Sequence, residues 1–247
     1  MNELKSIVII PARFGSTRFP GKPLAQISSK SMIQHVYERV LQSKCVTDVF
    51  VATDDLRIVQ AVTDFGGKAC MTSNHHRSGT DRVAELAGKL EADLIVNVQG
   101  DEPLIDPRCI DAAVEPFRSE PELMISTLKS AGNSADEFHN PNVVKVVTDR
   151  DGYALYFSRS PIPYALGDAY DSGGQQAFFK HIGLYVYRKN FLELLPRLKE
   201  SALEKSEALE QLRFLENGFG IKVVQYEYES IAVDTPADLE RVNRLFD

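Results

Sequence analysis

The alternation of apolar and polar stretches in the first hundred residues predicts strands that alternate with helices. Residues 6–11 (SIVIIP) form a continuous apolar, β-branched run, which is typical of a strand buried on both faces. Apolar residues then recur at helical spacing from Met32 to Leu41, behind Ser31 as a helix cap. Further strands are expected at 48–53, 68–72 and 93–98, and further helices at 56–65 and 79–91. This alternation favours an α/β fold with a mostly parallel sheet and right-handed crossovers.

After about residue 120 the pattern is less regular. Strands are expected at 143–148, 153–158 and 182–187, with a polar, glycine-rich loop at 167–176. A helix around 203–216, a strand at 222–226 and a helix from Pro236 follow. No internal repeat, linker or low-complexity tract divides the chain. The simplest interpretation is one domain over residues 1–247, with a strand-rich insertion at about 154–187.

Composition and charge exclude several classes of protein. The 247 residues are 43% hydrophobic and 26% charged, as in ordinary soluble globular proteins. A net charge of −7 argues against a general affinity for nucleic acid or anionic membranes. The apolar run at 7–10 is too short for a membrane span or a signal peptide. Three cysteines without a CxxC spacing suggest small core residues in a reducing compartment, so we expect a cytoplasmic protein.

One cluster of positive charge stands out against this acidic background. The segment 11–23 (PARFGSTRFPGKP) follows the first strand and carries Arg13, Arg18 and Lys22 beside small hydroxyls and glycines. Open α/β sheets bind ligands at the carboxyl ends of their strands, and these cations match phosphate oxygens. The segment fits neither the P-loop nor the GxGxxG pattern. On composition alone, a triphosphate site and a solvated basic loop are equally good interpretations.

The loop at 11–24 (PARFGSTRFPGKPL) resembles the signature loop of the cytidylyltransferases that activate 3-deoxy-manno-octulosonate (Kdo), the CMP-Kdo synthetases. The resemblance continues in order along almost the whole chain, so it is highly specific. Its segments are VATDD at 51–55, SGTDR at 78–82, NVQGDEP at 97–103, NPNVVKVV at 140–147, ALYFSRSPIP at 154–163, KHIGLYVY at 180–187, LEQLR at 209–213 and VDTPADL at 233–239. It implies a Rossmann-like nucleotide-diphospho-sugar transferase fold.

The resemblance also implies a reaction, in which CTP and Kdo give CMP-Kdo and pyrophosphate for lipopolysaccharide or capsule synthesis. Two aspartates that follow apolar runs, Asp101 and Asp234, are implied as ligands of Mg²⁺, which prefers carboxylate and phosphate oxygens. Taken alone, either aspartate is more often a helix cap or turn residue, and we expect Glu102 and Asp106 to be structural. The implied catalytic residues are Arg13, Lys22, Asp101 and Asp234.

Two groups of binding residues follow from the same resemblance. The implied nucleotide site comprises Pro11, Ala12, Arg13, Ser16, Arg18, Lys22, Ser78, Gly79 and Thr80. The implied sugar site comprises Gln99, Arg159, His181, Tyr185, Glu210 and Gln211. Ser78 opens a helix and could serve purely as its cap. His181 and Tyr185 lie four apart on an expected strand and therefore share a face.

The sequence leaves the identity of the sugar open. The loop at 167–176 has no clear counterpart in the family, and 8-amino-Kdo or a sialic acid would present the same carboxylate and anomeric hydroxyl. A protein that senses CTP without chemistry, and a sugar-1-phosphate nucleotidyltransferase, are alternatives from other classes. The resemblance further suggests a homodimer formed through the insertion.

Overall fold

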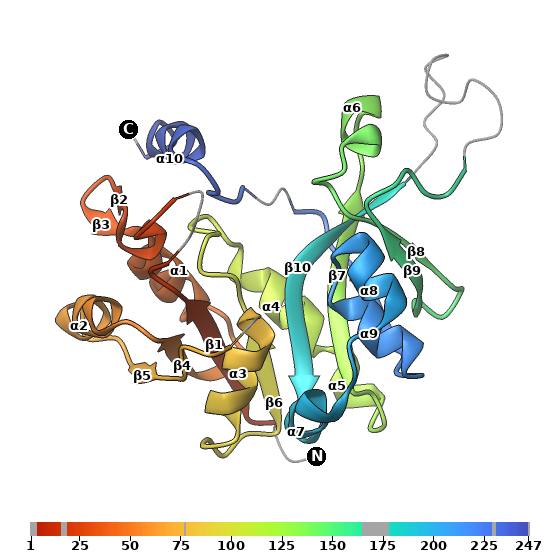
Figure 1. Cartoon of the computed structure of the whole chain (residues 1–247), viewed down its shortest axis with the longest axis horizontal. Helices are drawn as coiled ribbons and strands as arrows, with labels where there is room; N and C mark the ends of the chain where they lie inside the picture. The colour runs from red at the N-terminus through yellow and green to blue at the C-terminus, as the bar shows by residue number, and fades with distance from the viewer. Residues whose placement is uncertain (1–3, 16–18, 77, 165–177, 229–230, 247) are drawn as a thin grey trace.

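The computed structural model describes residues 4–15, 19–76, 78–164, 178–228 and 231–246. Its centre is a mixed sheet in the order β11-β7-β10-β6-β1-β4-β5 (Figure 1). The bounds of these strands are β1 Ser6–Ala12, β4 Val46–Thr53, β5 Ala69–Met71, β6 Leu94–Asn97, β7 Ile125–Ala131, β10 Phe179–Arg188 and β11 Ile221–Gln225. Only β10 runs antiparallel to its neighbours along this path, so the predicted mostly parallel sheet is confirmed.

Two smaller strand pairs and ten α-helices complete the described part of the chain. The strands β8 (Lys145–Thr148) and β9 (Ala154–Ser158) pair with each other at the edge of β10, and β2 (Gln26–Ile27) pairs with β3 (Lys30–Ser31). The α-helices are α1 Met32–Val40, α2 Leu56–Asp64, α3 Gly79–Ala87, α4 Pro107–Val114, α5 Pro116–Ser119, α6 Ala135–His139, α7 Lys189–Leu194, α8 Ala202–Glu207, α9 Gln211–Glu216 and α10 Pro236–Asn243. There are also two 3-10 helices, η1 (Lys22–Leu24) before α1 and η2 (Leu195–Arg197) between α7 and α8. No described helix has the length and apolar character needed to cross a bilayer.

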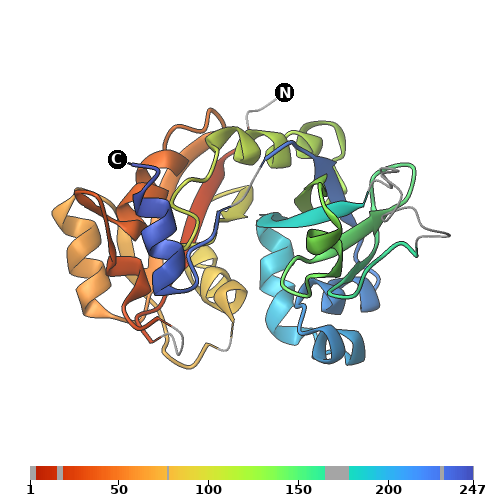
Figure 2. The same cartoon turned by 90° about the horizontal axis from the view of Figure 1, so that it is seen from above.

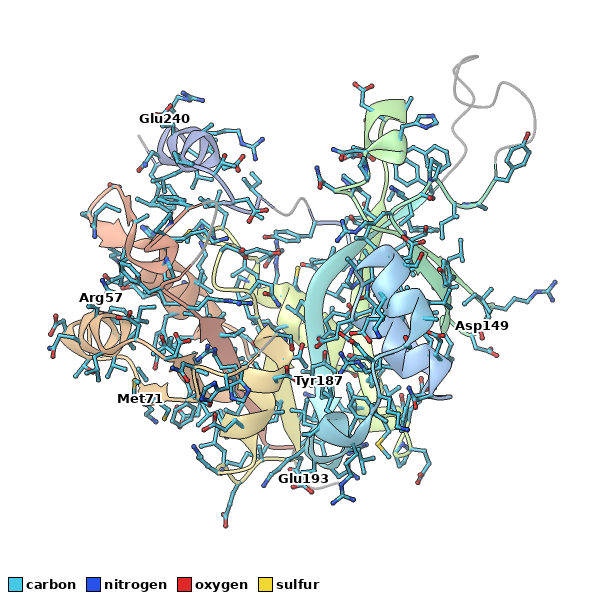
Figure 3. The ribbon with its side chains drawn as sticks, in the orientation of Figure 1. Arg57, Met71, Asp149, Tyr187, Glu193 and Glu240 are labelled. Atoms are coloured by element: carbon cyan, nitrogen blue, oxygen red, sulfur yellow. The ribbon has the colours of Figure 1, made fainter. Side chains whose placement is uncertain are left out.

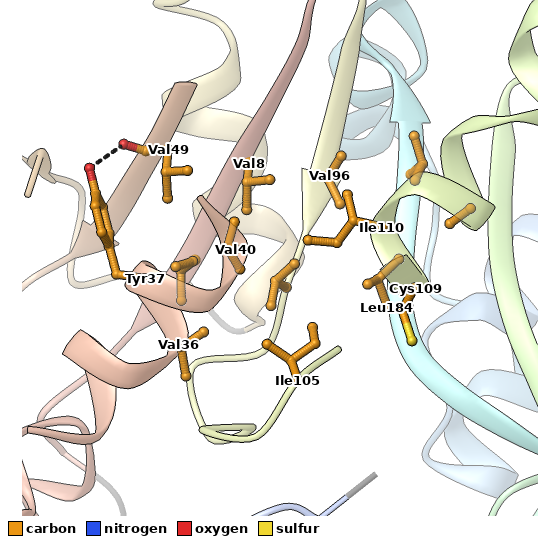
Figure 4. Close-up of a cluster of buried hydrophobic side chains, with 14 of the residues drawn as sticks. Val8, Val36, Tyr37, Val40, Val49, Val96, Ile105, Cys109, Ile110 and Leu184 are labelled. Atoms are coloured by element: carbon orange, nitrogen blue, oxygen red, sulfur yellow. Dashed lines mark hydrogen bonds between the residues drawn. The ribbon is translucent and has the colours of Figure 1, made fainter. Parts of the chain in front are cut away.

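The sheet is buried on both faces because β1 alternates between two hydrophobic clusters. Val8 and Ile10 pack in one cluster with residues of α1 and α4, and Figure 4 shows part of it. Ile7 and Ile9 pack in the other cluster with residues of α3, α7 and α9. Each fully buried side chain of this size contributes about 1.5–3 kcal/mol to folding. The continuous apolar run at 6–11 therefore corresponds to the doubly buried strand that it predicted.

Figures 1 and 2 show two lobes joined by the central sheet. One lobe carries β1, β4 and β5 with α1 and α2, and the other carries β8, β9, α8 and α9. The C-terminal helix α10 returns to the first lobe, where Val233 and Val242 pack with Ile27 and Met32 in a third, smaller cluster. Segments from the two ends of the chain therefore lie side by side.

Three features of the fold differ from the pattern analysis. The strand β7 was not predicted, although it lies inside the sheet between β10 and β11. The helices α4, α5, α6 and α7 were also not predicted, and the helix expected at 203–216 is two helices separated at Ala208, whose φ of 51° is left-handed. The described part of the range 154–187 contributes β9 and β10, and its role as an insertion that forms a dimer stays a prediction. The loop at 167–176 lies outside the described residues.

Candidate active site

A cavity of about 390 Å³ opens where β1 and β6 end. Four segments build it: the end of β1 with the basic loop, the turn after β6, the start of α3, and the segment that precedes α10. It is lined by Pro11, Ala12, Arg13, Gly15, Lys22, Pro23, Gly79, Arg82, Gln99, Gly100, Asp101 and Asp234. Its position at the carboxyl ends of parallel strands is where open α/β sheets bind ligands.

Lys22 joins the two aspartates inside this cavity. Its Nζ lies 2.7 Å from Asp101 Oδ2 and 3.1 Å from Asp234 Oδ1. The preceding Gly21 adopts a left-handed φ of 73°, and its N–H donates to the Phe14 carbonyl at 2.9 Å, which turns the loop back toward the sheet. The two carboxylates therefore share one cation, which is the arrangement that a metal bound between them would need.

Hydrogen bonds near the C-terminus hold Asp234 in place. The Val233 N–H donates to the Asp101 carbonyl at 2.9 Å, so the two aspartate segments are bonded directly. Thr235 and Asp238 form a capping box at the start of α10, and the Asp238 carboxylate also accepts from the Asp234 N–H. Thr235 is the helix cap, so capping does not account for the carboxylate of Asp234. Asp106 does cap α4, as expected of a structural residue.

The described residues fit an ion that takes most of its ligands from substrate or water. They contain no group of three or more His, Cys, Asp or Glu side chains placed to hold a metal. Asp101 and Asp234 provide two carboxylates beside open space. Mg²⁺ is commonly bound in this way, through one or two carboxylates together with phosphate oxygens and water.

The residues expected to bind nucleotide divide into three sets. Those that line the cavity are Pro11, Ala12, Arg13, Lys22 and Gly79. Ser16 and Arg18 lie outside the described residues. Ser78 caps α3 in a capping box with Asp81, and the Thr80 hydroxyl donates to the Glu210 carboxylate. Neither Ser78 nor Thr80 lines this cavity.

A second cavity, of about 530 Å³, lies between the start of α3 and the α8–α9 segment. Ser78 and Glu210 both line it. Burial raises the pKa of Glu210, and its Oε1 has no hydrogen-bond partner among the described residues. Gln211 follows at the first position of α9 and is buried. Of the expected sugar residues, Gln99 lines the first cavity and Glu210 the second.

His181 and Tyr185 lie on one face of β10, with ring centroids 5.3 Å apart. His181 Nε2 is 3.0 Å from the Thr127 hydroxyl, and its ring packs against Phe157. Although some of the residue reaches solvent, this packing lowers the pKa of His181 to about 3. Tyr185 stacks on Tyr187, which is buried and is labelled in Figure 3 near the lower end of β10. Burial raises the pKa of Tyr185 well above its usual value, and the nearby Glu210 carboxylate adds to that rise.

Arg159 is not brought to either cavity. Its guanidinium donates to the carbonyls of Pro141 at 2.9 Å, Glu207 at 2.7 Å and Ala208 at 3.4 Å. The side chain thus ties the end of β9 to the end of α8, and its expected contact with a sugar carboxylate stays a prediction.

Arg82 is a cavity residue that the pattern analysis did not single out. It is only 4% exposed, yet it lines the first cavity. It forms an ion pair with Asp54 at 2.7 Å. Both residues lie in segments that carry the family resemblance, SGTDR and VATDD. A charged residue on an amphipathic helix is usually solvated, so only the motif could have drawn attention to it.

Comparisons with known proteins agree with this geometry. A family model described as cytidylyltransferase matches residues 7–231. The 3-deoxy-manno-octulosonate cytidylyltransferase of Geotalea daltonii is 56% identical over 246 residues, covering 97% of each chain, and that of Geobacter sulfurreducens is 55% identical over 240 residues, covering 95% of this chain and 96% of the relative.

Solved structures extend the comparison to the fold. A CMP:2-keto-3-deoxy-manno-octonic acid synthetase complexed with CTP superposes with a TM-score of 0.93 at 48% identity, covering 98% of each chain. A 4-diphosphocytidyl-2C-methyl-D-erythritol synthase from Anaerococcus prevotii has a TM-score of 0.63 at 16% identity, with 99% of each chain covered, and shares the fold. On its sequence and its structure, this chain belongs to the 3-deoxy-manno-octulosonate cytidylyltransferases.

Proposed function

We propose that this protein transfers CMP from CTP to the anomeric hydroxyl of Kdo, giving CMP-Kdo and pyrophosphate. The observation that carries the proposal is the meeting of Lys22, Asp101 and Asp234 in one cavity at the carboxyl ends of β1 and β6. The two relatives named for this reaction match 97% and 95% of the chain, and the related synthetase was solved with CTP.

The reaction needs one substitution at phosphorus. The anomeric oxygen forms a bond to the α-phosphorus, the bond from that phosphorus to the bridging oxygen of the pyrophosphate breaks, and the hydroxyl proton passes to solvent. A Mg²⁺ ion held by Asp101 and Asp234 would offset charge on the α-phosphate and acidify the attacking hydroxyl. Catalysis otherwise depends on positioning and electrostatic stabilisation, as in other phosphoryl transfers.

Lys22 and Arg13 supply the positive charge that the leaving pyrophosphate requires. Both line the cavity, and Lys22 already lies against the two carboxylates. When an ion and a triphosphate bind there, the ammonium of Lys22 is free to turn toward the phosphate oxygens. A donor to the negative charge that develops in the transition state contributes about 2.7–4 kcal/mol to its stabilisation.

We place the sugar beside Glu210, which lines the second cavity and lies near the hydroxyl of Tyr185. Glu210 Oε1 is a buried oxygen without a partner among the described residues, and the same holds for the hydroxyl of Tyr185 and for Asn97 Oδ1. Asn97 lies directly opposite Tyr185 across the β6–β10 pair. Buried polar atoms are costly unless they are hydrogen-bonded, and a polyhydroxylated sugar offers the missing partners.

We further propose Mg²⁺ dependence, a homodimer and a role in making lipopolysaccharide or capsule. Leu155 on β9 and Tyr164 beyond it are large exposed hydrophobic side chains within the range expected to form the dimer. Because CTP is made and used inside cells, we place the reaction in the cytoplasm.

A panel of substrates tests the function. Purified protein is mixed with each of the four nucleoside triphosphates and with Kdo, 8-amino-Kdo, a sialic acid or a sugar 1-phosphate, with Mg²⁺ or with EDTA, and pyrophosphate release is measured. We expect release from CTP with Kdo and Mg²⁺. Binding of CTP without release in any combination would instead indicate a sensor, and release with a sugar 1-phosphate would indicate the other transferase class.

A further inference from the structure

Strand β10 lies beside β7 (Figure 1), and the pairing of the two strands contains a β-bulge. The register shifts between Ile182 and Tyr185, which lie opposite Leu128 and Thr127. Residues 183 and 184 between them have no opposite residue on β7. Backbone groups that leave the ladder at such a bulge need other hydrogen-bond partners when they are buried.

The hydroxyl of Thr127 provides a partner for the bulge. Thr127 is fully buried, and its Oγ1 lies 2.7 Å from the Leu184 carbonyl oxygen and 3.1 Å from the Ile182 carbonyl oxygen. Carbonyl oxygens only accept hydrogen bonds, and a hydroxyl has a single proton to donate. That proton is therefore directed at the two carbonyls, with the shorter contact at Leu184.

The third contact of this hydroxyl is with His181 Nε2, at 3.0 Å. Because the proton of Thr127 is already used, Nε2 has to be the donor in this contact. The pKa of His181 is lowered to about 3, so the ring is neutral near pH 7 and carries one proton. A proton on Nε2 leaves Nδ1 as a hydrogen-bond acceptor.

The Nδ1 atom has no hydrogen-bond partner within the described part of the chain. The ring of His181 contacts those of Phe157 and Tyr185, with centroids 5.0 Å and 5.3 Å away, and these contacts hold its orientation. The hydroxyl of Tyr185 also lacks a partner among the described residues. An acceptor and a hydroxyl are therefore available to one ligand at this face of β10.

We propose that Thr127 is a positioning residue, which keeps the proton of His181 on Nε2 and leaves Nδ1 to accept a hydrogen bond from a hydroxyl of the sugar. The part that concerns the sugar rests on the proposed function. The part that concerns the proton follows from the bulge alone, because the two carbonyls decide in which direction Thr127 donates. The irregular pairing of β10 thus sets the protonation of one side chain.

The 15N NMR signals of the His181 imidazole test the position of the proton without any substrate. They are assigned by their absence from His181→Gln, and the spectra are recorded near pH 7. In the wild type we expect a proton on Nε2 and none on Nδ1, with slow exchange of that proton because it is bonded to Thr127. Thr127→Val replaces the hydroxyl by a methyl group of similar size, and it should give a mixture of both tautomers and faster exchange. Thr127→Ser keeps the hydroxyl and should give the wild-type spectrum.

Steady-state kinetics test the contact with the sugar. In Thr127→Val the KM for Kdo should rise about tenfold, because one oriented hydrogen bond is lost, while the KM for CTP stays the same. Ser126→Ala is the matched control: the Ser126 hydroxyl is also buried and donates to a carbonyl, that of Ala113 at 2.6 Å, but on the opposite face of β7. This variant should lose stability to a similar extent and keep the wild-type His181 spectrum and both KM values.

Three results would overturn the proposal. A wild-type ring proton on Nδ1, or a Thr127→Val spectrum equal to that of the wild type, would show that Thr127 does not set the tautomer. An unchanged KM for Kdo in Thr127→Val would remove Nδ1 from sugar binding. A wild-type protein that releases no pyrophosphate from CTP and Kdo would contradict the proposed function and the sugar contact with it, whereas the NMR spectra would still decide the role of Thr127.

Discussion

Replacing Lys22 by alanine removes the cation that lies between Asp101 and Asp234. Both carboxylate oxygens contact Lys22 Nζ, at 2.7 Å and 3.1 Å, so they lie close to each other. Without the lysine, nothing between them offsets their negative charge. Two unit charges 4 Å apart interact by about 4 kcal/mol at an effective dielectric constant of about 20. The side chains of Lys22, Asp101 and Asp234 are 15%, 27% and 42% exposed, so solvent screens much of the repulsion between the two carboxylates. We therefore expect the substitution to lower the free energy of unfolding by only about 1 kcal/mol.

The same substitution should have two opposite effects on the site. Turnover should fall about a hundredfold, equivalent to about 2.7 kcal/mol of transition-state stabilisation, because the leaving phosphates lose a preorganised donor. Metal binding without nucleotide should become tighter, because the ammonium no longer competes for the two carboxylates. Pyrophosphate release measures the first effect, and titration with Mn²⁺ followed by electron paramagnetic resonance measures the second.

Lys30→Ala provides the control for both measurements. Lys30 is also paired with a carboxylate, Glu38, at 2.5 Å, but it lies outside the cavity. Its replacement should leave turnover and Mn²⁺ affinity as they are in the wild type. Near-normal turnover of Lys22→Ala would remove this lysine from the mechanism, and weaker Mn²⁺ binding would refute the idea that it holds the place of a metal.

Three further changes probe other parts of the site. Asp234→Asn should abolish the Mg²⁺-dependent release of pyrophosphate with the fold intact; an unchanged Mg²⁺ titration would refute its role as a ligand. Gly100→Ala should lower turnover more than stability, because the added Cβ lies 3.1 Å from the Pro11 carbonyl oxygen and displaces the turn that carries Asp101. A fully active variant would show that the turn accommodates the Cβ without moving Asp101. His181→Gln should make the free energy of unfolding less sensitive to acid. In the folded protein His181 has a pKa of about 3, whereas in the unfolded chain it is protonated below about pH 6.5. As the pH falls from about 6.5 to about 3, the wild type therefore loses at most about 1.4 kcal/mol of unfolding free energy per pH unit. Parallel pH profiles of urea unfolding for the variant and the wild type would contradict this.

Periodicity located the first lobe well because its strands are buried on both faces and its helices are amphipathic. It missed β7, where Ser126, Thr127, Lys129 and Ser130 are buried among apolar neighbours and hide the alternation. These polar side chains have specific partners: the Ser126 hydroxyl donates to the Ala113 carbonyl, and Lys129 donates to the Thr148 hydroxyl. Such pairing is a tertiary property that no local pattern contains.

The residues of the site that directly follow parallel strands could be predicted from the sequence, and those placed by tertiary contacts could not. The loop at 11–23 and Asp101 both follow parallel strands, so their approach follows from the topology. Asp234 comes from a distant segment, and only the family resemblance implied that it joins them. Arg82 was missed because its burial depends on Asp54 and Thr72, which the sequence does not place beside it.

The docking of α10 connects folding to metal affinity. Asp234 precedes this helix, which is attached to the first lobe by the small cluster around Ile27, Met32, Val233 and Val242 and by hydrogen bonds of Asn243 with Ser28 and Gln26. Small clusters open locally at a lower free-energy cost than a whole domain does. Each opening would carry one of the two carboxylates away while the sheet stays folded, and the observed affinity for a divalent ion would scale with the docked fraction. Substitutions at this distant contact can therefore weaken the ion site without touching it.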